Sequence, residues 1–181
     1  INDASNPGHF NWHINTRYNW GEPWYAGFRE SQTSYRLMNQ DFFSRNLLPR
    51  MLGWFSMSAQ TSIEDTEWLL ARASGFDAGF AFNLSLRNVE ANGQSDLIFD
   101  AIRVWEYARM AGAFTPEQKI RMQDIKKEFH LEQTGGNTWD LYPYHIVRFE
   151  HEQKIRQPGE PVHSIFDFAN PYDAQPLLFL I

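Results

Sequence analysis

Two short apolar segments, separated by an amphipathic helix pattern, constrain the fold of this 181-residue chain more than any other feature. Residues 51–57 read Met-Leu-Gly-Trp-Phe-Ser-Met, a run typical of a strand buried within a sheet. Residues 76–86 form a second strand pattern, in which apolar residues alternate with small or polar ones. Strands that alternate with helices build a parallel sheet. The sequence therefore predicts an α/β fold.

Helix-start and helix-stop signals surround these strands. The strongest is Thr115-Pro116-Glu117-Gln118, in which a capping Thr, a first-turn Pro and a Gln three residues after the Thr form a capping box. A weaker start lies at Ser62, which Asp65 follows three residues later. The apolar spacing of residues 31–46 predicts a further helix. The other expected boundaries are Gly75 as a C′ residue, Ser95 or Asp96 as a start, and Gly112 as an end.

The sequence pattern changes after about residue 129. Glycine and proline interrupt short strand-like segments there, notably at Gly135-Gly136, Pro143 and Pro158-Gly159. The expected strands cover residues 140–149, 162–168 and 177–181. We therefore expect an antiparallel β segment, with a domain boundary between about residues 130 and 160.

Two architectures fit this order of elements. One is a small open α/β domain, and the other is the last βα units of a (β/α)8 barrel followed by the antiparallel segment. Neither strand is followed by a glycine-rich phosphate loop, which disfavours a nucleotide-binding sheet. A complete barrel needs about 250 residues, so the barrel interpretation requires a longer polypeptide. Residues 1–130 would then belong to the barrel, and residues 131–181 would begin an accessory β domain.

Both ends of the sequence favour a piece of a longer polypeptide. The chain starts at Ile1 and ends in the apolar run 176–181, whereas natural termini are usually polar and frayed. The alternative is a native C-terminal strand within a sheet. We therefore expect the remainder of a longer chain as one partner of this segment.

Composition excludes several classes of function. The chain has no cysteine, which rules out disulfides, a thiolate metal site and a cysteine nucleophile. Its net charge is -6, so a basic surface for nucleic acid is not favoured. No apolar run approaches the roughly 18 residues of a membrane span. Metalloprotease and serine-hydrolase motifs are absent, so we expect neither a metal nor a cofactor.

Aromatic residues concentrate within residues 10–28. Asn, His, Arg and Glu lie between them, and Pro and Gly prevent a regular element. Long ordered loops of this kind are often functional. We therefore expect a ligand to bind near the aromatic residues of this segment, which are Phe10, Trp12, Tyr18, Trp20, Trp24, Tyr25 and Phe28.

Three segments resemble carbohydrate-active (β/α)8 enzymes. Residues 17–25, Arg-Tyr-Asn-Trp-Gly-Glu-Pro-Trp-Tyr, resemble a substrate loop of such an enzyme. So does the Met-Leu-Gly-Trp-Phe run of residues 51–55, together with the helix region of residues 67–80 that follows. Residues 166–176 resemble the first strands of an accessory β-sandwich after such a barrel. The resemblance to glycoside hydrolases implies acid/base cleavage of a glycosidic bond, and a secreted or periplasmic location.

Glycoside hydrolysis needs two carboxyl groups, one as the acid and the other as nucleophile or base. Glu22 is the first candidate, because it lies between Trp20 and Trp24, and apolar rings favour the protonated form of a carboxyl group. In the alternative interpretation, Glu22 pairs with a neighbouring arginine. Glu90, which follows the second strand, is the second candidate. The second carboxylate lies alternatively upstream of Ile1.

Aromatic and polar side chains are expected to hold the sugar. Trp20, Trp24 and Trp54 offer flat faces for stacking. Trp68 and Trp105 lie on apolar helix stripes, so we expect them in the core. Alternatively, the polar candidates are turn residues or structural side chains. The expected hydrogen-bonding residues are His13, Arg17, Asn83 and Asn88.

Two functions other than hydrolysis remain open at this point. One is a binding module without catalysis, which holds a glycan or a protein partner, and the other is a structural piece of a larger assembly. Two carboxyl groups about 5 to 10 Å apart across an aromatic cleft would favour hydrolysis, whereas an aromatic surface without them would favour binding. Glu64, Asp65 and Glu67 are interpreted as helix-start charges.

Overall fold

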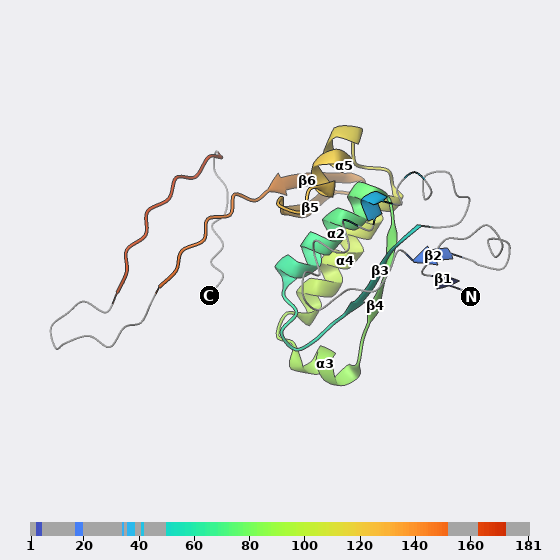
Figure 1. Cartoon of the computed structure of the whole chain (residues 1–181), viewed down its shortest axis with the longest axis horizontal. Coiled ribbons are helices and arrows are strands. Elements are labelled where there is room, and N and C mark those ends of the chain that lie inside the picture. The colour runs from blue at the N-terminus through green and yellow to red at the C-terminus, as the bar shows by residue number, and fades with distance from the viewer. Residues whose placement is uncertain are drawn as a thin grey trace. The chain divides into compact units, whose positions relative to one another are not determined.

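The computed structural model describes residues 3–4, 17–19, 34, 36–38, 41, 50–151 and 163–172 (Figure 1). Contacts divide the chain into two units, Ile1–Pro143 and Tyr144–Ile181. The first unit contains both helices and strands, so the chain has the α/β class that the sequence predicts. None of the described helices combines the length and the apolar surface that a membrane crossing requires.

A parallel sheet lies in the first unit. Its four strands are β1 (Asp3–Ala4), β2 (Arg17–Asn19), β3 (Arg50–Ser56) and β4 (Gly79–Asn83), and their order in space is their order along the chain. Each pair of neighbouring strands is parallel. Helix α2 (Ile63–Phe76) connects β3 to β4. The βαβ unit predicted from the two apolar segments is therefore confirmed.

Helix α2 begins as the sequence predicts but ends differently. The Ser62 hydroxyl accepts a hydrogen bond from the backbone N–H of Asp65 at 3.1 Å, which is the expected N-cap. The C-cap is Asp77, which takes the left-handed conformation with φ of 49°. Gly75 therefore lies inside the helix, and its prediction as the C′ residue is wrong. A Cβ at Gly75 would lie 2.9 Å from the backbone oxygen of Lys119, so glycine is needed for close packing rather than for a turn.

The chain after β4 also differs from the prediction. The sequence predicts a strand to residue 86 and then a polar loop, but β4 ends at Asn83 and the short helix α3 (Leu86–Ala91) follows. Ser85 caps α3, because its hydroxyl accepts a hydrogen bond from the N–H of Asn88 at 3.2 Å. Leu84 continues the apolar alternation in sequence, yet its side chain is exposed. The alternation therefore overestimates the length of the strand.

Of the two helices that follow, the first has the predicted start and end, and the second has the predicted start. Helix α4 covers Ser95–Met110, and Gly112 after it adopts a left-handed φ of 67°. Helix α5 covers Pro116–Gln123. Its capping box is complete: the Thr115 hydroxyl accepts from the Gln118 N–H at 3.2 Å, and the Gln118 side chain accepts from the Thr115 N–H at 2.8 Å. Both helix predictions are confirmed.

The helix predicted over residues 31–46 agrees with the part of it that the structure describes. Residues 34, 36–38 and 41 are helical. Arg36 is fully buried there, and its Nη2 donates a hydrogen bond to the carbonyl of Phe76 at 3.4 Å. The guanidinium also lies over the Phe76 ring, 5.5 Å from its centre. This segment therefore contacts the C-terminal end of α2.

An antiparallel hairpin follows the helices. Its strands are β5 (Phe129–Gly135) and β6 (Thr138–Pro143). The antiparallel segment expected after residue 129 is therefore present as far as Pro143. Residues 144–149 and 163–168 form no strand, so the strand predictions for them are wrong. The expected strand over residues 177–181 lies outside the described residues.

Helix α2 contributes to two apolar cores. Every residue from Thr66 to Phe76 is buried. Trp68 and Trp105, both expected in the core, are exposed by 1% and 0% respectively. The core shared with the sheet contains Leu52, Phe55, Trp68, Leu69, Ala73, Phe76 and Ala78. The core shared with α4, α5 and the hairpin contains Leu70, Ala71, Val104, Trp105, Ala108, Phe114, Met122, Phe129 and Leu131.

The division of the chain after Pro143 agrees with this packing. Because Phe129 and Leu131 of β5 are buried in a core with α2 and α4, the hairpin belongs to the first unit. In the second unit, the rings of Phe149 and Phe166 stack with their centres 4.7 Å apart. The interpretation of residues 131–181 as the start of an accessory β domain stays a prediction.

Candidate functional site

The carboxyl ends of β3 and β4 bring two predicted site residues together. In parallel sheets with helical connections, ligands bind outside this edge. Trp54 of β3 is paired with Ala81 of β4, and Ser56 is paired with Asn83 at the strand ends. Trp54 and Asn83, which the sequence assigns to sugar binding, therefore lie on neighbouring strands near the same edge.

These two side chains share the face of the sheet that points away from α2. Phe55 and Phe82 are paired across the strands and pack against the core beneath α2. Because successive side chains of a strand point to opposite faces, Trp54 and Asn83 point to the other one. There Trp54 is 42% exposed, next to the small Ala81. The structure therefore presents an accessible indole ring beside the strand ends.

Asparagine side chains order the loops at this edge. Asn92 is buried, and its amide nitrogen donates to the carbonyls of Ser58 at 3.0 Å and Thr61 at 2.8 Å. The amide nitrogen of Asn88 donates to the carbonyl of Met57 at 2.8 Å. These bonds hold the α3 region against the loop after β3. Asn88, a predicted sugar-binding residue, thus has a structural bond in this structure.

Glu90 lies on α3 with its side chain exposed. Residues 56–62 and 83–95, which form the carboxyl edge of β3 and β4, contain this one carboxylate. Within the residues that the structure describes, no group of three or more His, Asp or Glu side chains is arranged to hold a metal ion.

The aromatic segment falls mostly outside the described residues. Arg17 begins β2, where it is paired with Asp3 of β1, and its side chain is not among those described. The role of Glu22 as an acid and its pairing with Glu90 stay predictions. The other candidates outside the described residues are His13, Trp20 and Trp24.

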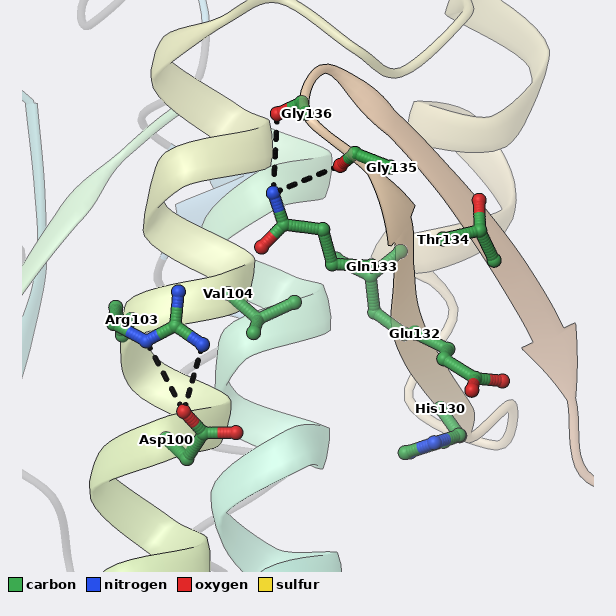
Figure 2. Close-up of a pocket in the computed structure, with 10 residues that line it drawn as sticks. Asp100, Arg103, Val104, His130, Glu132, Gln133, Thr134, Gly135 and Gly136 are labelled. Carbon is green, nitrogen blue, oxygen red and sulfur yellow. Dashed lines mark hydrogen bonds and ion pairs between the residues drawn. The ribbon is translucent and has the colours of Figure 1, made fainter.

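A concave region lies away from this edge, between α4 and the hairpin (Figure 2). It is an open groove of about 650 Å³. On α4, Arg103 donates two hydrogen bonds to one carboxylate oxygen of Asp100, at 2.7 and 3.1 Å. On the hairpin, the Gln133 amide donates to the carbonyls of Gly135 and Gly136, each at 3.1 Å. Asp100, Arg103 and Gln133 therefore already have hydrogen-bond partners within the groove.

His130 also lines the groove, and it contacts a buried carboxylate that the sequence analysis misses. Glu67 of α2 is 4% exposed, and its Oε1 lies 2.9 Å from Nδ1 of His130. The same oxygen accepts hydrogen bonds from Nε1 of Trp105 at 3.1 Å and from the N–H of Leu131 at 3.4 Å. The interpretation of Glu67 as a helix-start charge is therefore wrong.

One sequence signal does point to Glu67. Leu70 and Ala71 follow it three and four residues later, and Ser74 seven residues later, so all three lie on its face of α2. These three residues are fully buried. A carboxylate on the same buried helix face as these residues requires hydrogen-bond donors from another element. The donors themselves, 38 and 64 residues away, are not visible in the sequence.

Glu67 changes the acid–base behaviour of His130. Its hydrogen bond raises the pKa of His130 above 6.5, although partial burial of the imidazole acts in the opposite direction. The negative charges of Glu67 and Glu132 act in the same upward direction as the hydrogen bond. The His130 ring also stacks on Tyr142, with the ring centres 6.3 Å apart. His130 thus keeps its positive charge to a higher pH than a free histidine.

A buried arginine holds the segment after α5. Arg72 is 1% exposed, and its Nη1 and Nη2 donate to the carbonyls of Asp124 and Lys127. Its guanidinium also lies over the Trp68 ring, 5.2 Å from the centre. These contacts hold the charged guanidinium of Arg72 inside the core, so the role of Arg72 is structural.

Comparison with known proteins gives no match: no family model matches this chain, and neither a curated protein nor a solved structure is similar to it. The function of this chain therefore has to follow from the geometry of the carboxyl edge of β3 and β4.

Proposed function

We propose that this chain is part of a carbohydrate-active hydrolase, with its sugar site at the carboxyl edge of β3 and β4. The observation that carries the proposal is the exposed Trp54, which lies on the same face of the sheet as Asn83. An indole ring offers a flat apolar surface for the C–H face of a sugar. The Asn83 amide, which has both donors and an acceptor, suits a sugar hydroxyl.

The side chains around Trp54 support an open site on this face. Its partner across β4 is Ala81, and the neighbouring positions on the same face are Ser56 and Gly79. None of these fills the space above the indole ring with a large side chain. A ligand with a flat ring can therefore approach Trp54 from the side opposite α2.

The order of the strands supports the barrel alternative. The strands β1, β2, β3 and β4 are neighbours in chain order, and all are parallel. A (β/α)8 barrel has this order throughout, whereas a doubly wound sheet reverses its order at a switch point. We therefore favour a segment of a barrel, in which the face that carries Trp54 points to the interior.

The proposed catalytic residues are Glu22 and Glu90. Glu22 would act as the general acid, and Glu90 would act as the nucleophile or the base. The support for Glu90 is its place on α3, which follows the carboxyl end of β4 directly, and its exposed side chain. Glycoside hydrolases carry their carboxylates on the loops after barrel strands.

The second candidate function is glycan binding without catalysis. Hydrolysis needs two carboxyl groups, but residues 56–62 and 83–95 at the carboxyl edge supply one carboxylate, Glu90. This favours binding without catalysis. In that case Trp54 and Asn83 would hold a glycan, and Glu22 would have no catalytic part.

Binding is tested with soluble xylan, mannan, β-glucan and pectin by affinity electrophoresis. We expect Trp54→Ala to lower the affinity for the polysaccharide that binds by about tenfold or more, since that factor corresponds to about 1.4 kcal/mol of stacking. Phe99→Ala is the matched control, because Phe99 is 37% exposed on α4, away from the sheet. If none of the polysaccharides binds, or if both variants bind as the wild type does, the proposed site is wrong.

Catalysis is tested by release of reducing sugar from the same polysaccharides. Glu22→Gln and Glu90→Gln should each abolish turnover while leaving binding intact, whereas Glu117→Gln in the first turn of α5 should leave both unchanged. Binding without turnover in the wild-type protein would favour the binding module. Unchanged turnover in a Glu variant would remove that residue from the mechanism.

A further inference from the structure

The contact between Glu67 and His130 joins three elements of the first unit. Glu67 belongs to α2 and His130 to β5, and the same carboxylate accepts a hydrogen bond from Trp105 of α4. Both oxygens of Glu67 lie within hydrogen-bond distance of Nδ1 of His130, at 2.9 and 3.1 Å. Because the Glu67 side chain is 5% exposed and that of His130 is 45% exposed, the contact connects the core to the groove.

The charged and titratable groups around His130 come from each element that packs against it. Glu132 on β5 acts on the imidazole through its charge, whereas Glu67 acts through hydrogen bonds as well. On β6, Tyr142 stacks on the His130 ring. The remaining groups are Asp100 and Arg103 of α4, which line the same groove and pair with each other at 2.7 Å, and Asp140 of β6, which accepts from the Tyr142 hydroxyl at 3.3 Å.

We propose that the Glu67–His130 contact is a pH-dependent latch that fastens the hairpin onto α2 and α4. A carboxylate holds a protonated imidazole more strongly than a neutral one, because the imidazolium adds an opposite charge to the hydrogen bond. The hairpin supplies one wall of the groove, from His130 to Gly136, and α4 supplies the other. Weakening of this contact therefore loosens the wall of the groove that the hairpin supplies. The latch does not depend on the proposed sugar site.

The direction of the pH dependence follows from His130. Its pKa in the folded protein is raised above the ordinary value of 6.5, so its protonated form stabilises the folded state. This contribution is complete below a pH of about 6.5, the ordinary pKa of histidine, and it is lost as the pH rises through the raised pKa. The latch is therefore strongest below a pH of about 6.5 and weakens as the pH rises through the raised pKa of His130.

The first test is an NMR titration of the His130 imidazole in the whole chain, with the signal assigned by its loss in His130→Gln. We expect an apparent pKa above 6.5 in the wild type. Glu67→Gln keeps the shape of the side chain and should bring the pKa back to 6.5 or below, and Glu132→Gln should lower it by less. A wild-type pKa at or below 6.5, or a larger effect of Glu132→Gln, would overturn the proposal.

The second test is hydrogen exchange of peptides that cover residues 129–143, expressed as protection factors at pH 6 and pH 9. Protection of the hairpin in the wild type should fall by about tenfold for each unit by which the pKa is raised. His130→Gln should show no such fall, whereas His145→Gln, a control at an exposed histidine of the second unit, should behave as the wild type.

An equal pH dependence in the wild type and in His130→Gln would show that the Glu67–His130 contact is a static part of the core. If Glu67→Gln fails to fold, the wild-type titration and the His130→Gln exchange experiment decide the matter without it. His130 is half-exposed, so its replacement leaves the core side chains in place.

Discussion

Nε1 of Trp105 donates a hydrogen bond of 3.1 Å to Oε1 of Glu67, although the two residues lie 38 positions apart in the sequence. Trp105 is fully buried, and Glu67 is 4% exposed. A buried carboxylate is costly unless hydrogen-bond donors surround it. Trp105 therefore fills the core and also satisfies a charge within it.

Replacement of Trp105 by Phe tests this double role. Trp105→Phe keeps an aromatic ring but removes the donor, so the free energy of unfolding should fall by about 2 to 3 kcal/mol, as expected for a lost bond to a charged group. Trp139→Phe is the matched control, because the buried Nε1 of Trp139 has no hydrogen-bond partner among the described residues. Urea denaturation measures both variants. Equal losses would show that ring volume, and not the bond to Glu67, decides the result.

Replacement of Gly75 by Ala tests the close approach of α2 and α5. The new Cβ would lie 2.9 Å from the oxygen of Lys119 and 3.0 Å from the carbonyl carbon of Met122, both of which are backbone atoms. We expect a loss of about 1 to 3 kcal/mol, despite the better helix propensity of Ala. Gly93→Ala has no atom within 4 Å of its Cβ and should change stability by less than about 0.5 kcal/mol. A thermal melt of each variant is sufficient, and a neutral Gly75→Ala would contradict the packing described.

Two replacements of Arg72 separate its charge from its shape. Arg72→Met removes the donors to the carbonyls of Asp124 and Lys127 and should cost about 3 kcal/mol or more. Arg72→Lys keeps the charge but cannot reach two carbonyls with a planar group, so it should restore less than half of this loss. Denaturant unfolding measures the difference. Full recovery in the Lys variant would mean that the charge alone matters.

Thr115→Ala should destabilise the first unit by about 1 kcal/mol, because it removes one of the two bonds of the capping box of α5. Glu117→Gln, in the same turn, keeps the box and should have less than half of that effect. Circular dichroism during thermal unfolding of the two variants provides the comparison. The idea fails if Glu117→Gln is the more destabilising change.

The elements predicted best from the sequence are those with local causes. Ser62 and Thr115 cap helices through bonds to residues three positions away, so their signals lie within a single turn. The parallel pairing of β3 with β4 follows from the helix between them. The common face of Trp54 and Asn83 also follows from strand geometry.

The features that the sequence analysis missed have distant causes. Position 75 requires glycine because a Cβ there would lie too close to a backbone atom of Lys119. The carboxylate of Glu67 accepts hydrogen bonds from residues on α4 and β5. A charged side chain near the start of a helix is usually solvated, so this helix-start pattern wrongly predicted an exposed side chain for Glu67. Leu84 continues a strand pattern, but Ser85 starts a helix immediately after it. Tertiary packing and capping thus override local periodicity at these positions.

The burial of α2 along Thr66–Phe76 has a consequence for the way the first unit unfolds. A helix that packs on a sheet usually keeps one side in water, but here both the sheet and the layer of α4, α5 and the hairpin depend on the same helix. Neither layer can separate without exposing apolar surface of the other, so residues 50–143 should unfold as one cooperative block. A protein shortened at residue 130 would expose the core side of α2 and aggregate, whereas one that extends to Pro143 would keep that block whole.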